Sequence, residues 1–138
     1  MPRVGYRQPQ GGGQGFARTK KLFSGGTVTL IAADVVLNAQ VAIMRVPKDF
    51  VLTNISATYG DCDTGATLSS KIGDAGDDDR FMAAATTGQA GGSSTTLAST
   101  GLNYQFPADT DILHTANVAA VGLGPTPTIA LVMEGYMV

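Results

Sequence analysis

Apolar and polar residues alternate in short segments along this chain from Thr27 onward. A period of two places successive side chains on opposite faces of a β-strand, so each segment predicts a strand with one face toward a core. Clusters of Gly, Pro, Asp and Asn, which favour turns, separate the segments. The clearest strands are predicted at Thr27–Ala33, Gln40–Val46, Phe50–Tyr59, Ala66–Ile72, Thr110–Val118 and Thr128–Val138.

Two of these segments predict how their strands are placed. The third segment has the clearest alternation, and its predicted shared face carries Val51, Thr53, Ile55, Ala57 and Tyr59. The last segment, Thr128–Val138, is apolar on both faces, which is typical of a central or covered strand.

Other regions are less regular. Phe81–Ala85 is a short apolar piece of undefined type, and Thr86–Thr100 is rich in Gly, Ser, Thr and Ala, which predicts a long flexible loop. Only Phe81–Thr87 and Ala32–Ala39 could form a helix, and neither is long or well capped. Six to eight short strands separated by turns predict an all-β fold, an antiparallel β-sandwich of jelly-roll type.

The start of the chain has a different composition. The first 21 residues carry five basic residues and no acid, hence +5, whereas the remainder has four Lys or Arg against eleven Asp or Glu, hence −7. Glycines and prolines in PRVGYRQPQGGGQGFARTKK disfavour both helix and strand. We therefore predict an extended basic arm over residues 1–26, ordered by what it lies on, and a β-sandwich domain over residues 27–138.

Composition limits the class of protein further. Charged residues are 14% of the chain, well below the usual quarter, which indicates a surface partly covered by neighbours. We expect a homo-oligomer, either a dimer or a trimer. The single cysteine, Cys62, allows no intrachain disulfide and fits a reducing cytoplasm. No signal-like segment and no apolar run of about 18 residues is present, so we expect no membrane partner.

One acidic loop, Gly73–Arg80, is the strongest candidate for metal chemistry. Its carboxylates, Asp74, Asp77, Asp78 and Asp79, could bind a hard cation such as calcium, although their spacing is not that of an EF-hand. The favoured interpretation is a solvated turn in which Asp77 or Asp79 caps local N–H groups and Arg80 pairs with one of the aspartates. Calcium binding and docking of a basic arm remain open alternatives.

No other residues combine into a reactive site. His114, beside Asp109 and Asp111, lacks a positioned nucleophile and is interpreted as structural. Cys62 is a poor nucleophile because its acidic neighbours raise its pKa. The glycines at 11–13 and 15 lack the Lys-Ser/Thr of a phosphate-binding loop. The sequence therefore predicts no enzyme, no cofactor and no metal site.

A family resemblance lies between Val46 and Gly92. The stretch contains Val46-Pro47 before a strand, Asp61 and Asp63 in a turn, the loop GDAGDDDRF at Gly73–Phe81, and Gly88–Gly91. It resembles the capsid decoration, or cement, proteins of tailed bacteriophages, and Thr126–Leu131 is also similar. The resemblance implies a β-sandwich on the outer surface of an icosahedral virion, made in the host bacterial cytoplasm, that ties neighbouring major capsid subunits together.

In that setting the arm is the predicted contact with the shell or with a sister subunit. The residues that carry it are Arg3, Tyr6, Arg7, Phe16, Arg18, Lys20 and Lys21. We expect an acidic protein surface rather than nucleic acid as their partner, with Tyr6 and Phe16 as apolar anchors. The alternative function is a carbohydrate- or receptor-binding β-sandwich of a phage tail or surface, for which the absence of Trp leaves only four tyrosines to stack on sugars.

Overall fold

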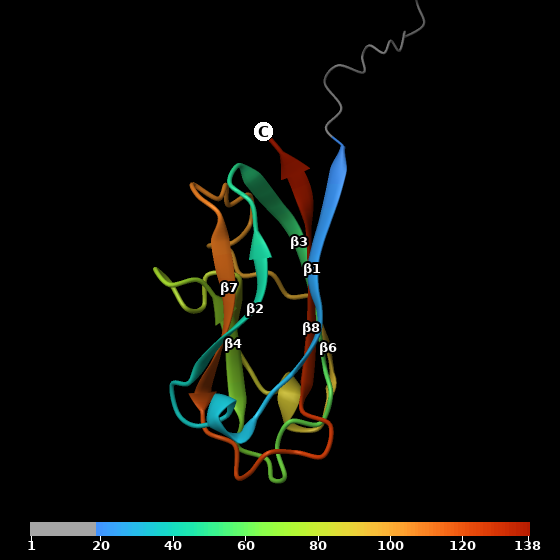
Figure 1. The fold of residues 1–138 in the computed structure, drawn as a ribbon, viewed down its shortest axis with the longest axis vertical. Helices are drawn as coiled ribbons and strands as arrows, with labels where there is room; N and C mark the ends of the chain where they lie inside the picture. The colour runs from blue at the N-terminus through green and yellow to red at the C-terminus, as the bar shows by residue number, and fades with distance from the viewer. Residues whose placement is uncertain (1–18) are drawn as a thin grey trace, which may run out of the picture.

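A computed structural model describes residues 19–138, which form two four-stranded antiparallel sheets packed face to face (Figure 1). The elements are β1 (Lys20–Thr29), the 3-10 turn η1 (Ala32–Asp34), β2 (Gln40–Val46), β3 (Phe50–Tyr59), β4 (Ser69–Gly73), β5 (Met82–Ala85), the 3-10 turn η2 (Thr87–Gln89), β6 (Gly92–Ser94), β7 (Thr110–Val118) and β8 (Thr128–Met137). The predicted bounds of β2, β3 and β7 are confirmed.

The strand order is that of a jelly roll. One sheet has the order β1-β8-β3-β6 and the other has the order β2-β7-β4-β5. The strands therefore pair as in one long hairpin that is folded over on itself: β1 with β8, β2 with β7, β3 with β6, and β4 with β5. The predicted β-sandwich is confirmed, and β8 lies between β1 and β3, as its two apolar faces indicate.

The core lies between the sheets and is built from alternate residues of each strand. In β3, Phe50 and Leu52 are fully buried at the start, and Ile55 and Ala57 are buried further along. A β-bulge after Leu52 shifts the register by one residue, so Val51 and Thr53 do not share the core face of Ile55, Ala57 and Tyr59, contrary to what the alternation predicts. Thr53 is exposed. Rings of Phe50, Phe81 and Phe106 stack in this core with centroids 5.4 to 5.9 Å apart.

The first strand corrects the predicted arm boundary. Strand β1 begins at Lys20 instead of Thr27, so residues 20–26, which are predicted as part of the arm, belong to this strand, and residues 20–24 pair with β8. Gly25 and Gly26 form a β-bulge in this pairing, with Gly26 at a φ of 73°. The rest of the predicted arm, with Arg3, Tyr6, Arg7, Phe16 and Arg18, lies outside the described residues.

Two further segments differ from the sequence prediction. Strand β4 begins at Ser69, three residues later than predicted, because the Asp63 carboxylate accepts the N–H groups of Thr67 and Leu68 and removes them from the sheet ladder. The long loop predicted at 86–100 contains η2 and the short strand β6, which pairs with the end of β3. The helices considered for 81–87 and 32–39 are a strand and a single 3-10 turn.

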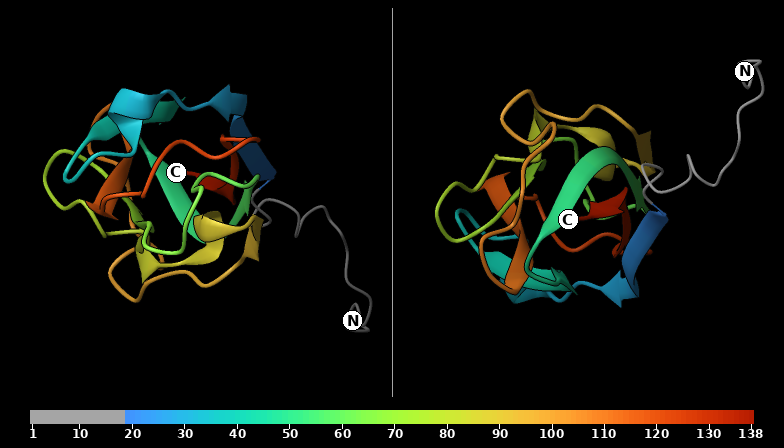
Figure 2. Two further views of the ribbon diagram at one scale, coloured as in Figure 1. Left: turned by 90° about the horizontal axis from the view of Figure 1, so that it is seen from below. Right: turned by 90° about the horizontal axis from the view of Figure 1, so that it is seen from above.

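The two ends of the sandwich differ. Pairing of Lys20 with Tyr136 and of Phe50 with Met137 places the start of β1 and the end of β8 at one end, the upper end in Figure 1. The loops between β1 and β2, β3 and β4, and β7 and β8 gather at the opposite end, which faces the viewer in the left panel of Figure 2. Within residues 19–138, no helix is long and apolar enough to span a membrane.

Candidate interaction surfaces

Exposed aliphatic side chains gather at the end of the sandwich opposite to the start of β1. Five residues from the β1–β2 loop, the end of β7 and the β7–β8 loop are between 45% and 67% exposed: Ile31, Val36, Leu37, Val118 and Val121. We call this set the apolar end. Single exposed aliphatic residues are common, but several on adjoining loops are typical of a surface that is covered by a partner.

Backbone hydrogen bonds hold the loops of the apolar end together. The N–H of Asn38 donates to the carbonyl of Ala116 at 2.8 Å, and the N–H of Ala120 donates to the carbonyl of Val35 at 2.9 Å. Both bonds join the β1–β2 loop to the end of β7 or to the residues that follow it. The apolar end is therefore part of a hydrogen-bonded framework rather than a set of independent loops.

A buried carboxylate, that of Asp63, joins one of these loops to the neighbouring β3–β4 loop. Asp63 is 3% exposed, and its Oδ1 accepts the N–H groups of Gly65 and Val121 at 2.9 and 2.8 Å. Its Oδ2 accepts those of Thr67 and Leu68 at 2.9 and 2.8 Å. Burial by itself would raise the pKa of Asp63, but the four backbone bonds favour the charged form and hold that pKa well below its usual value. Asp63 thus ties the β3–β4 loop to the β7–β8 loop.

The apolar end is not among the interaction surfaces that the sequence predicts. Its residues fall in segments that are predicted as strands or loops, and none of them belongs to the predicted contact set. The available signal was the presence of Val and Leu in the turn-rich segments at 34–38 and 119–125, where polar residues are usual. Their exposure depends on how the loops pack together, which alternation along the chain does not report.

At the other end, the described basic residues of the predicted contact set lie on β1. Lys20 and Lys21 are exposed, and the Nζ of Lys20 lies 3.4 Å from a carboxylate oxygen of Glu134 on β8. An exposed pair of this kind contributes little to stability. These two lysines are thus positioned by strand β1 of the domain. They directly follow the part of the predicted arm that lies outside the described residues.

The acidic loop between β4 and β5 is organised by one of its carboxylates. Asp74 is 6% exposed, and its Oδ1 accepts the N–H groups of Gly76 and Asp77 at 3.0 and 2.9 Å. Its Oδ2 accepts from Nε of Arg80 at 2.8 Å, and the Arg80 guanidinium lies 4.5 Å from the ring centroid of Tyr104. The predicted pairing of Arg80 with an aspartate is confirmed, and Asp74 is the partner.

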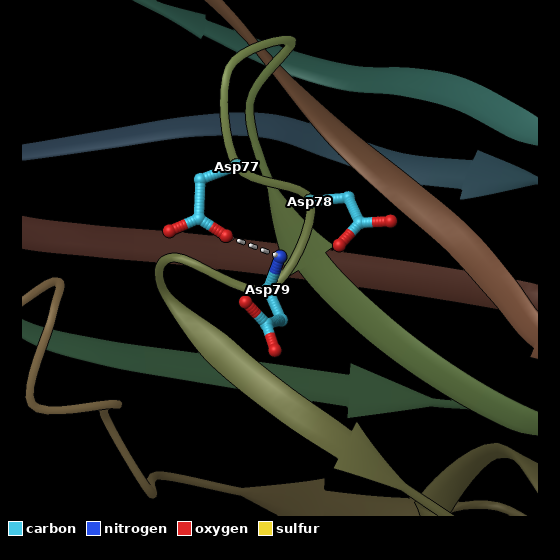
Figure 3. Close-up of side chains that lie close together, drawn as sticks. All are labelled: Asp77, Asp78 and Asp79. Atoms are coloured by element: carbon cyan, nitrogen blue, oxygen red, sulfur yellow. Dashed lines mark hydrogen bonds between the residues drawn. The ribbon is translucent and has the colours of Figure 1, made fainter.

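The other three carboxylates of this loop, Asp77, Asp78 and Asp79, lie within 4.8 Å of one another (Figure 3). Asp78 pairs with Nζ of Lys71 at 3.0 Å, and Asp77 accepts the N–H of Asp79 at 3.4 Å. The Asp77 carboxylate raises the pKa of Asp79, first by hydrogen bonding to its protonated form and then by repulsion. Exposed acidic groups commonly gather in this way without an ion, and the local bonds account for the arrangement.

The two candidate reactive residues are buried in the core. His114 is fully buried, neither ring nitrogen has a hydrogen-bond partner, and burial lowers its pKa to about 4. Its neighbours in sequence are engaged elsewhere, because Asp111 pairs with Arg45 at 2.8 Å and Asp109 accepts the N–H of Lys48 at 2.9 Å. Burial, followed by the nearby Asp61, raises the pKa of Cys62 to about 11. Neither residue is poised for nucleophilic chemistry.

The alternative sugar-binding function needs exposed aromatic rings. Tyr59 is buried, and Tyr104 packs edge-on against Phe106 with a centroid distance of 5.0 Å. The large, strongly exposed apolar side chains of residues 19–138 are all aliphatic. Among these described residues, the exposed surface therefore offers contacts for another protein more readily than for a stacked sugar.

Comparison with known proteins identifies similar folds. No protein-family model and no curated protein sequence matches this chain. A chain in the capsid asymmetric unit of cyanophage Pam1 is 24% identical, with a TM-score of 0.71, over 99% of this chain and 94% of that chain. A chain in the capsid of Ralstonia phage GP4 is 20% identical, with a TM-score of 0.67, over 88% of this chain and 85% of that chain. The shared feature is the fold, over most of each chain's length.

Proposed function

We propose that this protein is a structural component of a phage virion that binds the outer surface of the icosahedral capsid and clamps neighbouring major capsid subunits. The observation that carries the proposal is the similarity of its fold, over nearly the full length of both chains, to a chain in the cyanophage Pam1 capsid. The sequence resemblance of residues 46–92 to capsid decoration proteins points in the same direction.

The arrangement of the two candidate contacts suits a clamp. The apolar end lies at one end of the sandwich, and the basic arm joins the domain at the other end, at Lys20 (Figure 1). In this proposal the apolar end packs on one capsid subunit, and the cationic residues Arg3, Arg7 and Arg18 contact an acidic surface of the next. Once the first contact forms, the second forms at high effective concentration.

A pelleting assay with capsids that lack this protein tests the proposal. Because β1 begins at Lys20, the truncated protein should lack only residues 1–18 and keep the strand intact. A second variant, Leu37→Glu with Val121→Glu, places charge in the apolar end at two exposed positions. The matched control is Leu102→Glu, a substitution of another exposed leucine that lies outside the apolar end.

We expect the full chain and the control to pellet with capsids at saturating occupancy. The truncated protein and the double variant should remain folded and lose most of that binding. Failure of the full chain to bind capsids would contradict the proposed function. Saturating occupancy by both altered proteins would contradict the assignment of these two contacts.

A further inference from the structure

One side of the sandwich carries no charged residue. Residues 81–108, which include β5, β6 and the loop that leads to β7, contain no Asp, Glu, Lys, Arg or His. At the chain's average of 14% charged residues, about four of these 28 positions would carry a charge. Strands β5 and β6 lie on the side of the sandwich opposite to β1 and β2 (Figure 2). We call the surface formed by residues 81–108 the uncharged side.

The uncharged side is large enough for a stable interface between proteins. Only five of its 28 residues are buried, so 23 are exposed or half-buried. A standard protein–protein interface uses about 20–30 residues of each partner. A cavity of about 190 Å³ lies between β5 and β6 and is lined by uncharged residues, among them Met82, Ala84 and Thr96. A partner that packs over these two strands would cover the cavity as well.

Within the uncharged side, strand β5 has a free edge. It is the outer strand of the sheet β2-β7-β4-β5, so one edge of its backbone has no neighbouring strand in that sheet. The loop after β6 covers only the residue before β5, since the N–H of Ala98 donates to the carbonyl of Phe81 at 2.9 Å. The exposed residues Ala83, Ala84 and Ala85 have small side chains, which let another strand approach closely. Natural edge strands are commonly guarded by charged residues or proline, and β5 contains neither.

We propose that two copies of this chain associate through the uncharged side, with their β5 strands paired antiparallel about a two-fold axis at Ala84. In this register Ala84 lies opposite Ala84 of the other copy, and Ala83 lies opposite Ala85. Antiparallel pairing of a strand with its own copy is self-complementary, as a two-fold interface requires. The two outer sheets then form one continuous sheet of eight strands. This inference goes beyond capsid binding and can hold or fail independently of it.

Charge favours a second copy over a different protein as the partner. Residues 19–138 carry six basic and eleven acidic residues, a net charge of −5, so two copies of the domain repel each other where their charged surfaces meet. A surface without charge lets identical domains meet with the least repulsion, whereas a different protein could offer complementary charges. Antiparallel pairing also separates the acidic residues Asp77, Asp78 and Asp79, because they precede β5 and therefore lie at opposite ends of the paired strands.

Sedimentation equilibrium of the full chain over a range of concentrations measures this association. We expect a monomer–dimer equilibrium that Ala84→Lys weakens at least about 100-fold, because two lysines would lie opposite each other at the axis. The matched control is Ala75→Lys, since Ala75 is exposed in the β4–β5 loop outside the uncharged side, and it should change the dissociation constant by less than about threefold. A monomeric wild-type chain, or a dissociation constant that Ala84→Lys leaves unchanged, would overturn the proposal.

Mixing two charge variants tests whether the two β5 strands face each other. Ala84→Glu should be monomeric for the same reason as Ala84→Lys. A mixture of the two variants places opposite charges across the axis, so we expect association within about tenfold of the wild type. Because Ala84 is exposed, both variants should keep the circular dichroism spectrum of the wild type. Two folded variants that stay monomeric when mixed would overturn the pairing of the β5 strands.

A disulfide tests the register without depending on a loss of binding. Directly opposite residues of an antiparallel pair have Cα atoms about 4.5–5.5 Å apart, within the range of about 4.4–6.8 Å that a disulfide spans. Upon oxidation, Ala84→Cys should therefore form a covalent dimer on a non-reducing gel, whereas Ala75→Cys should stay largely monomeric. Equal yields of covalent dimer from the two variants would contradict this register.

Capsid pelleting of Ala84→Lys separates this inference from the proposed function, because the substitution leaves the apolar end and the arm intact. We expect Ala84→Lys to pellet with capsids as the wild type does. A wild-type chain that is monomeric in solution, together with loss of pelleting in Ala84→Lys, would assign the uncharged side to a capsid subunit and overturn the second copy as the partner. Failure of the wild-type chain to pellet, with its self-association intact, would contradict the proposed function alone.

Discussion

Replacing Asp63 by Asn tests whether one buried carboxylate organises the end of the sandwich that carries the exposed aliphatic residues. The substitution keeps the size and shape of the side chain. Each carboxylate oxygen accepts two backbone N–H groups, Oδ1 from Gly65 and Val121 and Oδ2 from Thr67 and Leu68. In Asn one of these oxygens becomes an NH₂ group, which faces two donors and can accept from neither.

The expected loss follows from these bonds. A hydrogen bond to a charged acceptor contributes about 1.5–3 kcal/mol, so losing two of them should lower the free energy of unfolding by about 3–6 kcal/mol at pH 7. That is a large part of the 5–15 kcal/mol that stabilises a typical domain. Asp61→Asn is the matched control, because Oδ1 of Asp61 accepts only a weak bond of 3.4 Å from the N–H of Asp63 and should cost less than about 1 kcal/mol.

Urea denaturation followed by circular dichroism measures both variants, and its pH dependence gives a second test. The pKa of Asp63 is depressed in the folded state, so its contribution is present above the unfolded value of about 3.9 and is lost as the pH falls toward the folded value. The stability difference between wild type and Asp63→Asn should therefore shrink between pH 5 and pH 2. Equal midpoints for Asp63→Asn and Asp61→Asn at pH 7 would refute this reasoning.

Two further predictions concern the core and the central strand. Burial lowers the pKa of His114 to about 4, so at pH 5 this residue is protonated in the unfolded chain but not in the folded protein. The protein should therefore be about 2 kcal/mol less stable at pH 5 than at pH 8. In urea titrations at the two pH values, His114→Leu should remove this loss. An unchanged pH dependence in that variant would contradict the assignment. Gly135→Ala should lower the free energy of unfolding by at least about 3 kcal/mol, because the new Cβ would overlap the carbonyl of Val51. Gly26→Ala has open space around a φ of 73°, so it should lower the free energy of unfolding by only about 1 kcal/mol in the same urea titrations. Equal costs at the two glycines would show that β8 can shift to make room.

The strands that could be predicted from the sequence are those that bury their own alternate side chains in the core. In β3 and β7 alternate residues enter the core, so the two-residue period and the turn residues define both ends. Strand β1 has no fully buried residue and is ordered by pairing with β8, which no local pattern reports. Strand β6, of composition Gly-Ser-Ser, is likewise ordered by its partner, β3.

The acidic loop shows the same limit for a candidate site. The sequence predicts that Arg80 pairs with an aspartate of the loop, and four candidates lie within six residues of it. The structure selects Asp74 because that residue directly follows β4 and is buried, where its carboxylate can accept two backbone N–H groups as well as the guanidinium. The sequence could therefore predict that an arginine pairs with an aspartate, but which of the four aspartates it pairs with depends on their positions in the folded domain.

The placement of the two proposed capsid contacts has a quantitative consequence. The five exposed aliphatic side chains of the apolar end form only a small patch. The arm has three basic residues among its first 18, and salt screens the attraction between exposed charges. Each contact alone should therefore be weak. Joined through one rigid sandwich, the second contact becomes intramolecular and can raise the overall affinity by about 10²–10⁴-fold. Loss of either contact should therefore lower capsid affinity by that factor rather than in proportion to the area removed, and raising the salt concentration should weaken the full chain much more than the chain that lacks residues 1–18.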